Sequence, residues 1–427
     1  MRYLAEFTPV SGLVFRDARP FQAGENTVSF NLDFPPPPEA FWSALNRTLA
    51  RAGGRGPLRS LRVRGYYLAD KDGPLLPAMA DLVSRQPADD ESAPEILTIL
   101  RPRRALAEIA RSGDGLELLW IGEPGVRSRP CEQAFLRPDP FLNYLQGDMG
   151  TRTRSDLVSL KSLFREEPRT GVQLEGRNAQ QGRLYTERIV FPNLDRQVRF
   201  CLVVDTPAAL PDAVLTGHLV RLGGEGKLGR LSLAEADNHT HPAFPARARG
   251  NVYETVWRSG DGKPPFRVKL CLLTPAVYSA RKELLWRPDT RTPAWRPFWM
   301  NNASGGWCRP TFDNQRYRLR LVAAAAPKAF ALGAWDRAQQ NPRPLHRCQP
   351  AGAVYYFELA PRQGVSPDEA LESFFDDFWL GTLLVKAKPI APPRTRKEQT
   401  VVRTRDTVTP HGLRGFGWTT IGAWNYA

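Results

Sequence analysis

The chain has 427 residues, of which 42% are hydrophobic, so it is long enough to fold as two domains with buried cores. It has no run of about 18 apolar residues, which excludes a membrane-spanning helix, and Glu6 interrupts the apolar stretch that an export signal needs, so we expect a cytoplasmic protein. The net charge of +15 favours a polyanionic partner such as RNA, DNA or an anionic membrane surface, unless it only reflects an arginine-rich proteome.

Strand-like segments predominate along the chain, as short runs of apolar, β-branched and aromatic residues. They lie at residues 3–7, 61–68, 197–204, 268–273, 317–322 and 354–359. Helices are predicted at residues 39–50, 156–164, 212–222 and 367–380. Strict alternation of strand and helix is missing, so the sequence predicts an α+β fold with antiparallel sheets rather than a Rossmann sheet or a TIM barrel.

The helix at residues 367–380 has the clearest start. Ser366 occupies the N-cap position, Pro367 is the first helical residue, and Glu369 completes the S-x-x-E pattern of a capping box. The helix at residues 39–50 begins after a proline and repeats its apolar side chains at helical spacing.

A repeated pattern of elements suggests an internal duplication of the chain. The predicted helix 212–222 leads into a glycine-rich loop and a strand, and the predicted helix 367–380 leads through a basic stretch into a second glycine-rich loop and an apolar end. Two copies of one βαββαβ-type unit would give this pattern, as would coincidence in a chain with 34 glycines. Duplication predicts two domains, residues 1–242 and 243–427.

Three long segments interrupt this pattern, at residues 71–94, 281–310 and 386–414. The second holds four Trp and six Lys or Arg residues. Its Trp rings could stack on unpaired bases while the cations follow the RNA backbone. The alternative is a place in a core, where Trp is more often found. The third carries eight Lys or Arg and two acidic residues, and is either a solvated surface or a polyanion contact.

The loop at residues 223–229 contains the pattern G-x-G-x-x-G. A dinucleotide-binding loop needs a strand before it and a helix after it, and here the predicted order is reversed. A Walker loop is excluded because Leu228 follows Lys227 where Ser or Thr must ligate magnesium. The loop therefore either brings its backbone, with Lys227 and Arg230, close to a phosphodiester or is a plain tight turn.

Catalytic and metal-binding patterns are scarce. The five cysteines are scattered without a C-x-x-C pair, which indicates free, mostly buried thiols in a reducing compartment. His239 and His241 lack a second ligand cluster, and the consecutive Asp376 and Asp377 would not share a helix face. His218 is either a general base for RNA cleavage or an ordinary helix residue. We therefore expect no cofactor, no metal and no enzymatic activity.

Seven segments form an ordered series along nearly the whole chain. They are residues 7–21 (FTPVSGLVFRDARPF), 169–172 (RTGV), 182–186 (GRLYT), 222–226 (LGGEG), 272–276 (LLTPA), 350–357 (PAGAVYYF) and 415–418 (GFGW). Together they resemble the third subunit of the type III-B CRISPR Cmr effector complex, a member of the RAMP superfamily. The chain departs from the family pattern at Gly12 and in the long segment 386–410.

The resemblance implies two ferredoxin-like, RRM-related domains in a non-catalytic subunit that holds the repeat-derived 5′ handle of the crRNA. It implies three partners, namely the crRNA, the large polymerase/cyclase-like subunit and the neighbouring backbone RAMP subunit, and no membrane. The RNA-binding residues that it suggests are Arg16, Arg19, Phe21, Arg169, Thr170, Gly171, Arg183, Tyr185, Gly223, Gly224, Gly226, Lys227 and Arg230. Amides and Arg would contact phosphates, and Tyr or Phe would stack on bases, whereas the alternative for Tyr185 is a place in the core.

Two other functions stay open on the sequence alone. The chain would be a RAMP endoribonuclease that processes repeat RNA if His218 acts as a base. It would be a pure protein–protein scaffold if its charge only supports assembly around RNA that other subunits hold.

Overall fold

The computed structural model describes most of the chain, and its described residues form two compact units. The described ranges are 1–15, 35–51, 61–102, 119–120, 125–175, 178–210, 217–237, 240–277, 316–332, 335–336, 341–342, 346–382, 385–389, 401–408 and 414–425. Unit 1 is drawn from Met1–Pro74, Ser159–His239 and Phe330–Cys348, and unit 2 from Leu75–Val158, Thr240–Ala329 and Gln349–Ala427. The predicted boundary between residues 242 and 243 stays a prediction.

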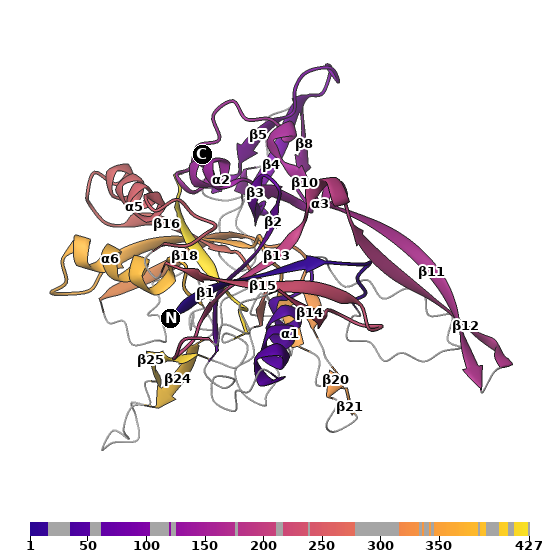
Figure 1. Cartoon of the computed structure of the whole chain (residues 1–427). Helices are drawn as coiled ribbons and strands as arrows, with labels where there is room; N and C mark the ends of the chain where they lie inside the picture. Colours follow the sequence, from indigo (N-terminus) through magenta and orange to yellow (C-terminus); the bar gives the residue numbers. More distant parts are fainter. Residues whose placement is uncertain are drawn as a thin grey trace. The chain divides into compact units, whose positions relative to one another are not determined.

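Five neighbouring strands of an antiparallel sheet form the centre of unit 1, in the order β2-β13-β1-β15-β14 (Figure 1). They are β1 (Arg2–Pro9), β2 (Arg62–Asp70), β13 (Arg199–Asp205), β14 (His218–Arg221) and β15 (Leu228–Ala236). Burial alternates along β1, with Tyr3, Ala5 and Phe7 fully buried, so one face of the sheet is directed into the core.

Helix α1 (Pro38–Arg51) packs on the buried face of this sheet and confirms the helix predicted at residues 39–50. The Phe41 ring lies 4.5 Å from the Phe200 ring and 5.4 Å from the rings of Phe7 and Tyr66, measured between centroids. Aromatic pairs at these separations add to the stabilisation from buried area. The aromatic cluster thus joins the helix to strands β1, β2 and β13.

A long hairpin of β11 (Phe164–Glu175) and β12 (Asn178–Pro192) extends away from the sheet of unit 1 (Figure 1). The sequence did not predict it. The helix predicted at residues 156–164 is wrong over most of its length, because only α3 (Leu160–Leu163) is α-helical and Phe164 already pairs with Pro192 in the hairpin. The remaining elements of this unit are η3 (Leu194–Arg196), β19 (Phe330–Leu332), β20 (Trp335–Asp336), β21 (Asn341–Pro342) and β22 (His346–Gln349).

The main sheet of unit 2 is also antiparallel, in the order β18-β23-β16-β26. Its strands are β16 (Phe266–Leu272), β18 (Tyr317–Ala325), β23 (Val354–Pro361) and β26 (Thr419–Ala423). In chain order this is second, third, first, fourth, which is also the order of β2, β13, β1 and β15 in unit 1. A shared order is what duplication of one βαββαβ unit would produce.

Helices α5 (Ala248–Ser259) and α6 (Pro367–Phe378) pack on this sheet. The Ser366 side chain accepts a hydrogen bond from the Glu369 N–H at 3.2 Å, which confirms the predicted N-cap of α6. The sequence did not predict α5. The other elements are β3 (Gly73–Pro77), β4 (Leu82–Pro87), β5 (Ile96–Ile99), β6 (Arg101–Pro102), β7 (Leu119–Trp120), β8 (Val126–Pro130), β9 (Ala134–Leu136), α2 (Pro138–Leu145), η2 (Arg154–Asp156), β10 (Val158–Ser159), β17 (Ala276–Val277), β24 (Val385–Pro389) and β25 (Val401–Val408).

The predicted α+β fold with mostly antiparallel sheets is confirmed, and its ferredoxin-like character stays a prediction. The segment 71–94, which the sequence suggested was irregular, instead contains β3 and β4. Among the described residues, no helix combines the length and apolarity needed to cross a bilayer.

Candidate nucleic-acid interface

The opening segment, residues 11–15, lies between the base of the long hairpin and the glycine loop of unit 1. Leu13 exchanges both backbone hydrogen bonds with Val190 at the base of the long hairpin, at 2.7 and 2.8 Å. On its other side, the Val14 carbonyl accepts a hydrogen bond from the Gly224 N–H at 2.7 Å. Segments that are some two hundred residues apart in the sequence are therefore in direct contact.

The glycine loop, residues 222–227, is the turn between β14 and β15. Two backbone hydrogen bonds close it, from the Leu222 N–H to Lys227 at 2.8 Å and from the Lys227 N–H to Gly224 at 3.1 Å. Gly223 has a φ of +81°, and a Cβ atom there would lie 2.3 Å from the Val14 carbonyl oxygen. Only glycine allows this close approach of the loop to the opening segment.

Gly226 also has a positive φ, of +66°, but faces open space. Gly223 and Gly226 are exposed, whereas the Gly224 and Lys227 residues are half-buried. The loop therefore presents backbone at the surface, with one cation at its closing end.

The prediction of a helix at residues 212–222 is wrong at residues 218–221. Residues 218–221 form strand β14, which pairs with β15, and residues 211–216 lie outside the described part of the chain. Pairing with β15 favours the strand conformation of residues 218–221, and Gly217 before them is a weak helix former. His218 is consequently a strand residue, and the glycine loop joins two strands.

The long hairpin brings two further predicted motifs together. In its register, Arg169 is opposite Glu187, Thr170 is opposite Thr186, and Gly171 is opposite Tyr185. Arg169 and Thr170 are exposed and Gly171 is half-buried. Arg183 and Tyr185 belong to β12, for which the structure describes the backbone at these two positions.

Phe191 was not predicted as a site residue, yet it lies at the centre of this region. The guanidinium carbons of Arg165 and Arg169 lie 5.9 and 5.8 Å from its ring centroid, within cation–π distance. A Cβ atom on Gly12 would come within 2.7 Å of the same ring, so the opening segment packs directly against it. The strand character of residues 188–192 is the signal that would have revealed this side chain.

Other predicted residues are placed differently. Arg16, Arg19 and Phe21 lie outside the described residues, as do the Trp-rich segment and most of the basic segment. Arg230 is exposed on the outer face of β15, opposite Leu219 of β14 and Thr8 of β1, rather than in the loop itself.

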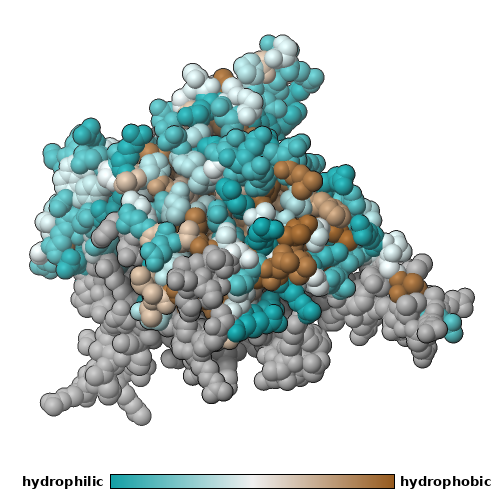
Figure 2. Space-filling model, in the orientation of Figure 1, coloured by the Kyte–Doolittle hydropathy of each residue, from teal (hydrophilic) through white to brown (hydrophobic). Residues whose placement is uncertain are grey.

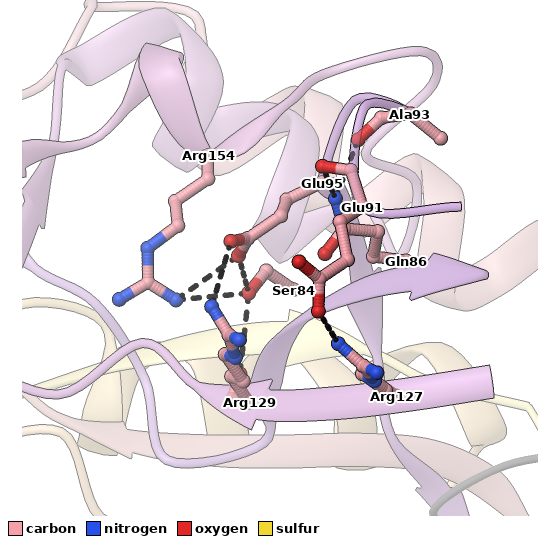
Figure 3. Close-up of polar contacts among 8 residues, drawn as sticks. All are labelled: Ser84, Gln86, Glu91, Ala93, Glu95, Arg127, Arg129 and Arg154. Carbon is pink, nitrogen blue, oxygen red and sulfur yellow. Dashed lines mark hydrogen bonds and ion pairs between the residues drawn. The ribbon is translucent and has the colours of Figure 1, made fainter. Parts of the chain in front are cut away.

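A second arginine-rich surface, on the strands β4 and β8 of unit 2, is compensated by its own carboxylates (Figure 3). Glu95 accepts hydrogen bonds from the Ser84 hydroxyl at 2.6 Å and from Arg129 and Arg154 at 3.2 and 3.3 Å. The Ser84 hydrogen bond, together with both arginines, lowers the pKa of Glu95 despite some burial. These arginines therefore brace the strands and have less charge to offer to RNA.

The residues considered as metal ligands have structural contacts. Asp376 accepts a hydrogen bond from Arg249 at 3.1 Å, and Asp377 accepts one from the Tyr317 hydroxyl at 2.8 Å. The His241 Nδ1 atom accepts from the Ala243 N–H at 3.1 Å. Within the described ranges, no group of three or more His, Cys, Asp or Glu side chains is arranged to hold a metal.

The four described cysteines are free and buried, as the sequence predicted, and Cys308 lies outside the described residues. Burial raises the pKa of Cys131 to about 11 and that of Cys271 to about 12, so both thiols are unreactive near neutral pH.

The sequence matches the family model of CRISPR-associated protein (Cas_Cmr3) over residues 6–373, and no curated protein gives a significant sequence match. Two structures of a type III-B Cmr-beta complex contain similar chains. One, bound to cognate target RNA and AMPPnP, has 14% identity and a TM-score of 0.43. The other, bound to cognate target RNA, has 15% identity and a TM-score of 0.40, and each similarity covers 83% of this chain and 86% of that chain.

A chain of the Csm3-Csm4 subcomplex from a type III-A CRISPR-Cas interference complex is similar at 10% identity, with a TM-score of 0.31, over 85% of this chain and 98% of that chain. The family model spans most of the 427 residues. The chain therefore belongs to the Cas_Cmr3 family of CRISPR-associated proteins.

Proposed function

We propose that this chain is the crRNA-binding third subunit of a type III-B Cmr effector complex, and that it holds the repeat-derived 5′ handle without catalysing a reaction. The observation that carries the proposal is the convergence of the opening segment, the hairpin base and the glycine loop at Leu13, Val14 and Val190. We refer to residues 11–15, 165–171, 186–191 and 222–227 as the handle surface.

The chemistry of the handle surface suits single-stranded RNA. The exposed loop backbone can approach a phosphate closely because its glycines have no side chain, and Lys227 adds a positive charge beside it. Phe191, flanked by Arg165 and Arg169, offers an aromatic ring and planar cations of the kind that stack on unpaired bases. Arg165 also forms an ion pair with Glu167 at 2.6 Å, so Arg169 is the stronger candidate for an RNA contact. The net charge of +15 adds long-range attraction for the guide.

The proposal includes the partners that the resemblance implies. These are the large polymerase/cyclase-like subunit and the neighbouring backbone RAMP subunit, in a cytoplasmic complex. The absence of activity is also proposed. A repeat transcript incubated with the pure protein should stay intact, and cleavage that is abolished in His218→Ala would assign the chain to RNA processing instead.

Paired substitutions in the hairpin test the handle surface. Arg165→Ala with Arg169→Ala removes both cations beside Phe191, and we expect guide RNA affinity to fall about 10-fold or more, since each stacking or charge contact is worth about 1–3 kcal/mol. The matched control is Arg258→Ala, an exposed arginine paired with Glu254 on α5. Equal affinity of the double variant and the control, measured by fluorescence anisotropy, would remove the hairpin from the RNA site.

A further inference from the structure

One end of the unit 1 sheet carries a cluster of exposed aliphatic side chains. Eight large hydrophobic residues are exposed in the described part of the chain, and three of them, Val10, Leu219 and Leu228, gather here with exposed fractions of 56%, 65% and 37%. Figure 2 shows hydrophobic side chains grouped on the face where Figure 1 draws the strands of this sheet. Scattered apolar residues need no explanation, but a group of them marks an interaction site.

The strand register places these side chains in a row. Arg221 of β14 is opposite Leu228 of β15, and the Val10 N–H donates to the Leu228 carbonyl at 3.1 Å. The next row along the same face is Leu219, Arg230 and Thr8. Residues directly opposite one another lie about 5 Å apart, so aliphatic and cationic side chains alternate over one continuous patch.

The two arginines of the patch are available to a partner. Arg221 and Arg230 are exposed, and neither makes an ion pair with a described residue. Among the described residues, the patch contains no aromatic side chain, and its two arginines alternate with aliphatic side chains instead of flanking a ring. Its combination of leucine, valine and arginine matches a protein segment that carries aliphatic and acidic side chains.

Strand β14 is the last strand of the unit 1 order, and among the described elements it pairs only with β15. The outer edge of a terminal strand presents backbone donors and acceptors that another chain can pair with. On β14, the Arg221 carbonyl already accepts a hydrogen bond from the Arg47 side chain of α1 at 3.4 Å, so pairing is centred on Leu219. An added strand also lays alternate side chains on the adjoining sheet face, which here is the patch around Leu219.

We propose that this patch and the β14 edge dock an extended segment of another protein subunit of the effector complex. The segment adds a strand beside β14, places aliphatic side chains on Leu219 and Leu228, and places acidic side chains on Arg221 and Arg230. Arg230 is thereby assigned to a protein contact instead of an RNA contact. The inference rests on the proposed function in one respect, which is that the partner is a subunit of the effector complex.

A photo-crosslinking amino acid at position 219 tests the occupant in the complex reconstituted from purified subunits and guide RNA. The expected result is a crosslink to one segment of another protein subunit, rich in aliphatic and acidic residues, with slower amide exchange at residues 218–221 after assembly. A crosslink to RNA, a crosslink to a second copy of this chain, or no crosslink with unchanged exchange would overturn the proposal.

Leu219→Glu tests the energetics, with Leu194→Glu as its control. Leu194 lies in η3 of the same unit and is 83% exposed, so both variants add one acid to an exposed leucine. Leu219→Glu should lower affinity for the remaining protein subunits about 10-fold or more and leave the guide RNA affinity of the isolated chain unchanged. Equal assembly of the two variants would overturn the docking surface, whereas failure of the unsubstituted chain to bind guide RNA would overturn only the proposed function.

Discussion

Lys269 and Asp81 form a fully buried ion pair within unit 2, with Nζ and Oδ2 3.4 Å apart. The Asp81 carboxylate also accepts hydrogen bonds from the hydroxyls of Tyr144 and Tyr356 at 2.6 and 2.5 Å. Burial, reinforced by the Asp81 charge, raises the pKa of both tyrosines, which therefore stay protonated as donors. The Lys269 Nζ atom also lies 3.5 Å from the centroid of the Tyr144 ring, so the two tyrosines help to offset the cost of burying both charges.

Removing one member of this pair should be costly. Lys269→Met leaves Asp81 buried without its cation, and we expect the free energy of unfolding to fall by about 3–5 kcal/mol. Chemical denaturation measures the loss, with Arg258→Ala as a control that breaks only an exposed pair. A loss no larger than that of the control would contradict the assignment of a structural role to the pair.

Alanine substitutions at two glycines of the same loop distinguish the cost of backbone strain from the cost of a close contact. Gly226→Ala adds only the cost of a left-handed alanine, about 1 kcal/mol, because nothing lies within 4 Å of the new Cβ. Gly223→Ala adds the same strain and a contact of 2.3 Å with the Val14 carbonyl, so the loop must move away from the opening segment. We expect Gly223→Ala to be the less stable variant and to weaken guide RNA binding, whereas equal stability and equal affinity in both variants would contradict the proposed contact.

Secondary-structure elements were predictable where local chemistry decides them. The start of α6 follows from Ser366 and its side-chain cap, which a short stretch of sequence contains completely. Strand β14 was misassigned because its partner β15 decides its conformation. The hairpin β11–β12 was missed because charged residues on both faces, such as Arg165, Glu166 and Glu167, hide the alternation that marks a strand.

The three-stranded sheet β5-β4-β8 should respond to acid through Glu95 (Figure 3). The Ser84 hydrogen bond and the two arginines hold the pKa of Glu95 below its usual value of 4.5, so the ionised carboxylate stabilises the folded form. This contribution is complete above pH 4.5 and is lost as the pH falls through the lower folded-state pKa. The protection of the Ile96–Ile99 amides against exchange, taken relative to their intrinsic exchange rate at each pH, should fall over that range, and Glu95→Gln should abolish this fall. The same acid response in both proteins would exclude Glu95 as its source.

At the scale of the whole molecule, composition and strand patterns were sufficient for the α+β class. The ordered motif series was sufficient for the family. The convergence of the motifs was not predictable, because the contacts of Leu13 with Val190 and of Val14 with Gly224 depend on the register of distant strands. Phe191 was not predicted as a site residue for the same reason, because its contacts with Gly12, Arg165 and Arg169 are formed only in the folded chain.

The measurement that tests the central claim most directly is fluorescence anisotropy of the purified chain, with its large partner subunit present if solubility requires it. One guide RNA carries its native 5′ handle and the other carries the same handle with its bases scrambled, each at low and moderate salt. We predict tighter binding of the native handle that persists at moderate salt, because base contacts outlast the screening of phosphate contacts. Equal affinities that disappear together as salt rises would contradict recognition of the handle and leave only general attraction between a chain of charge +15 and RNA.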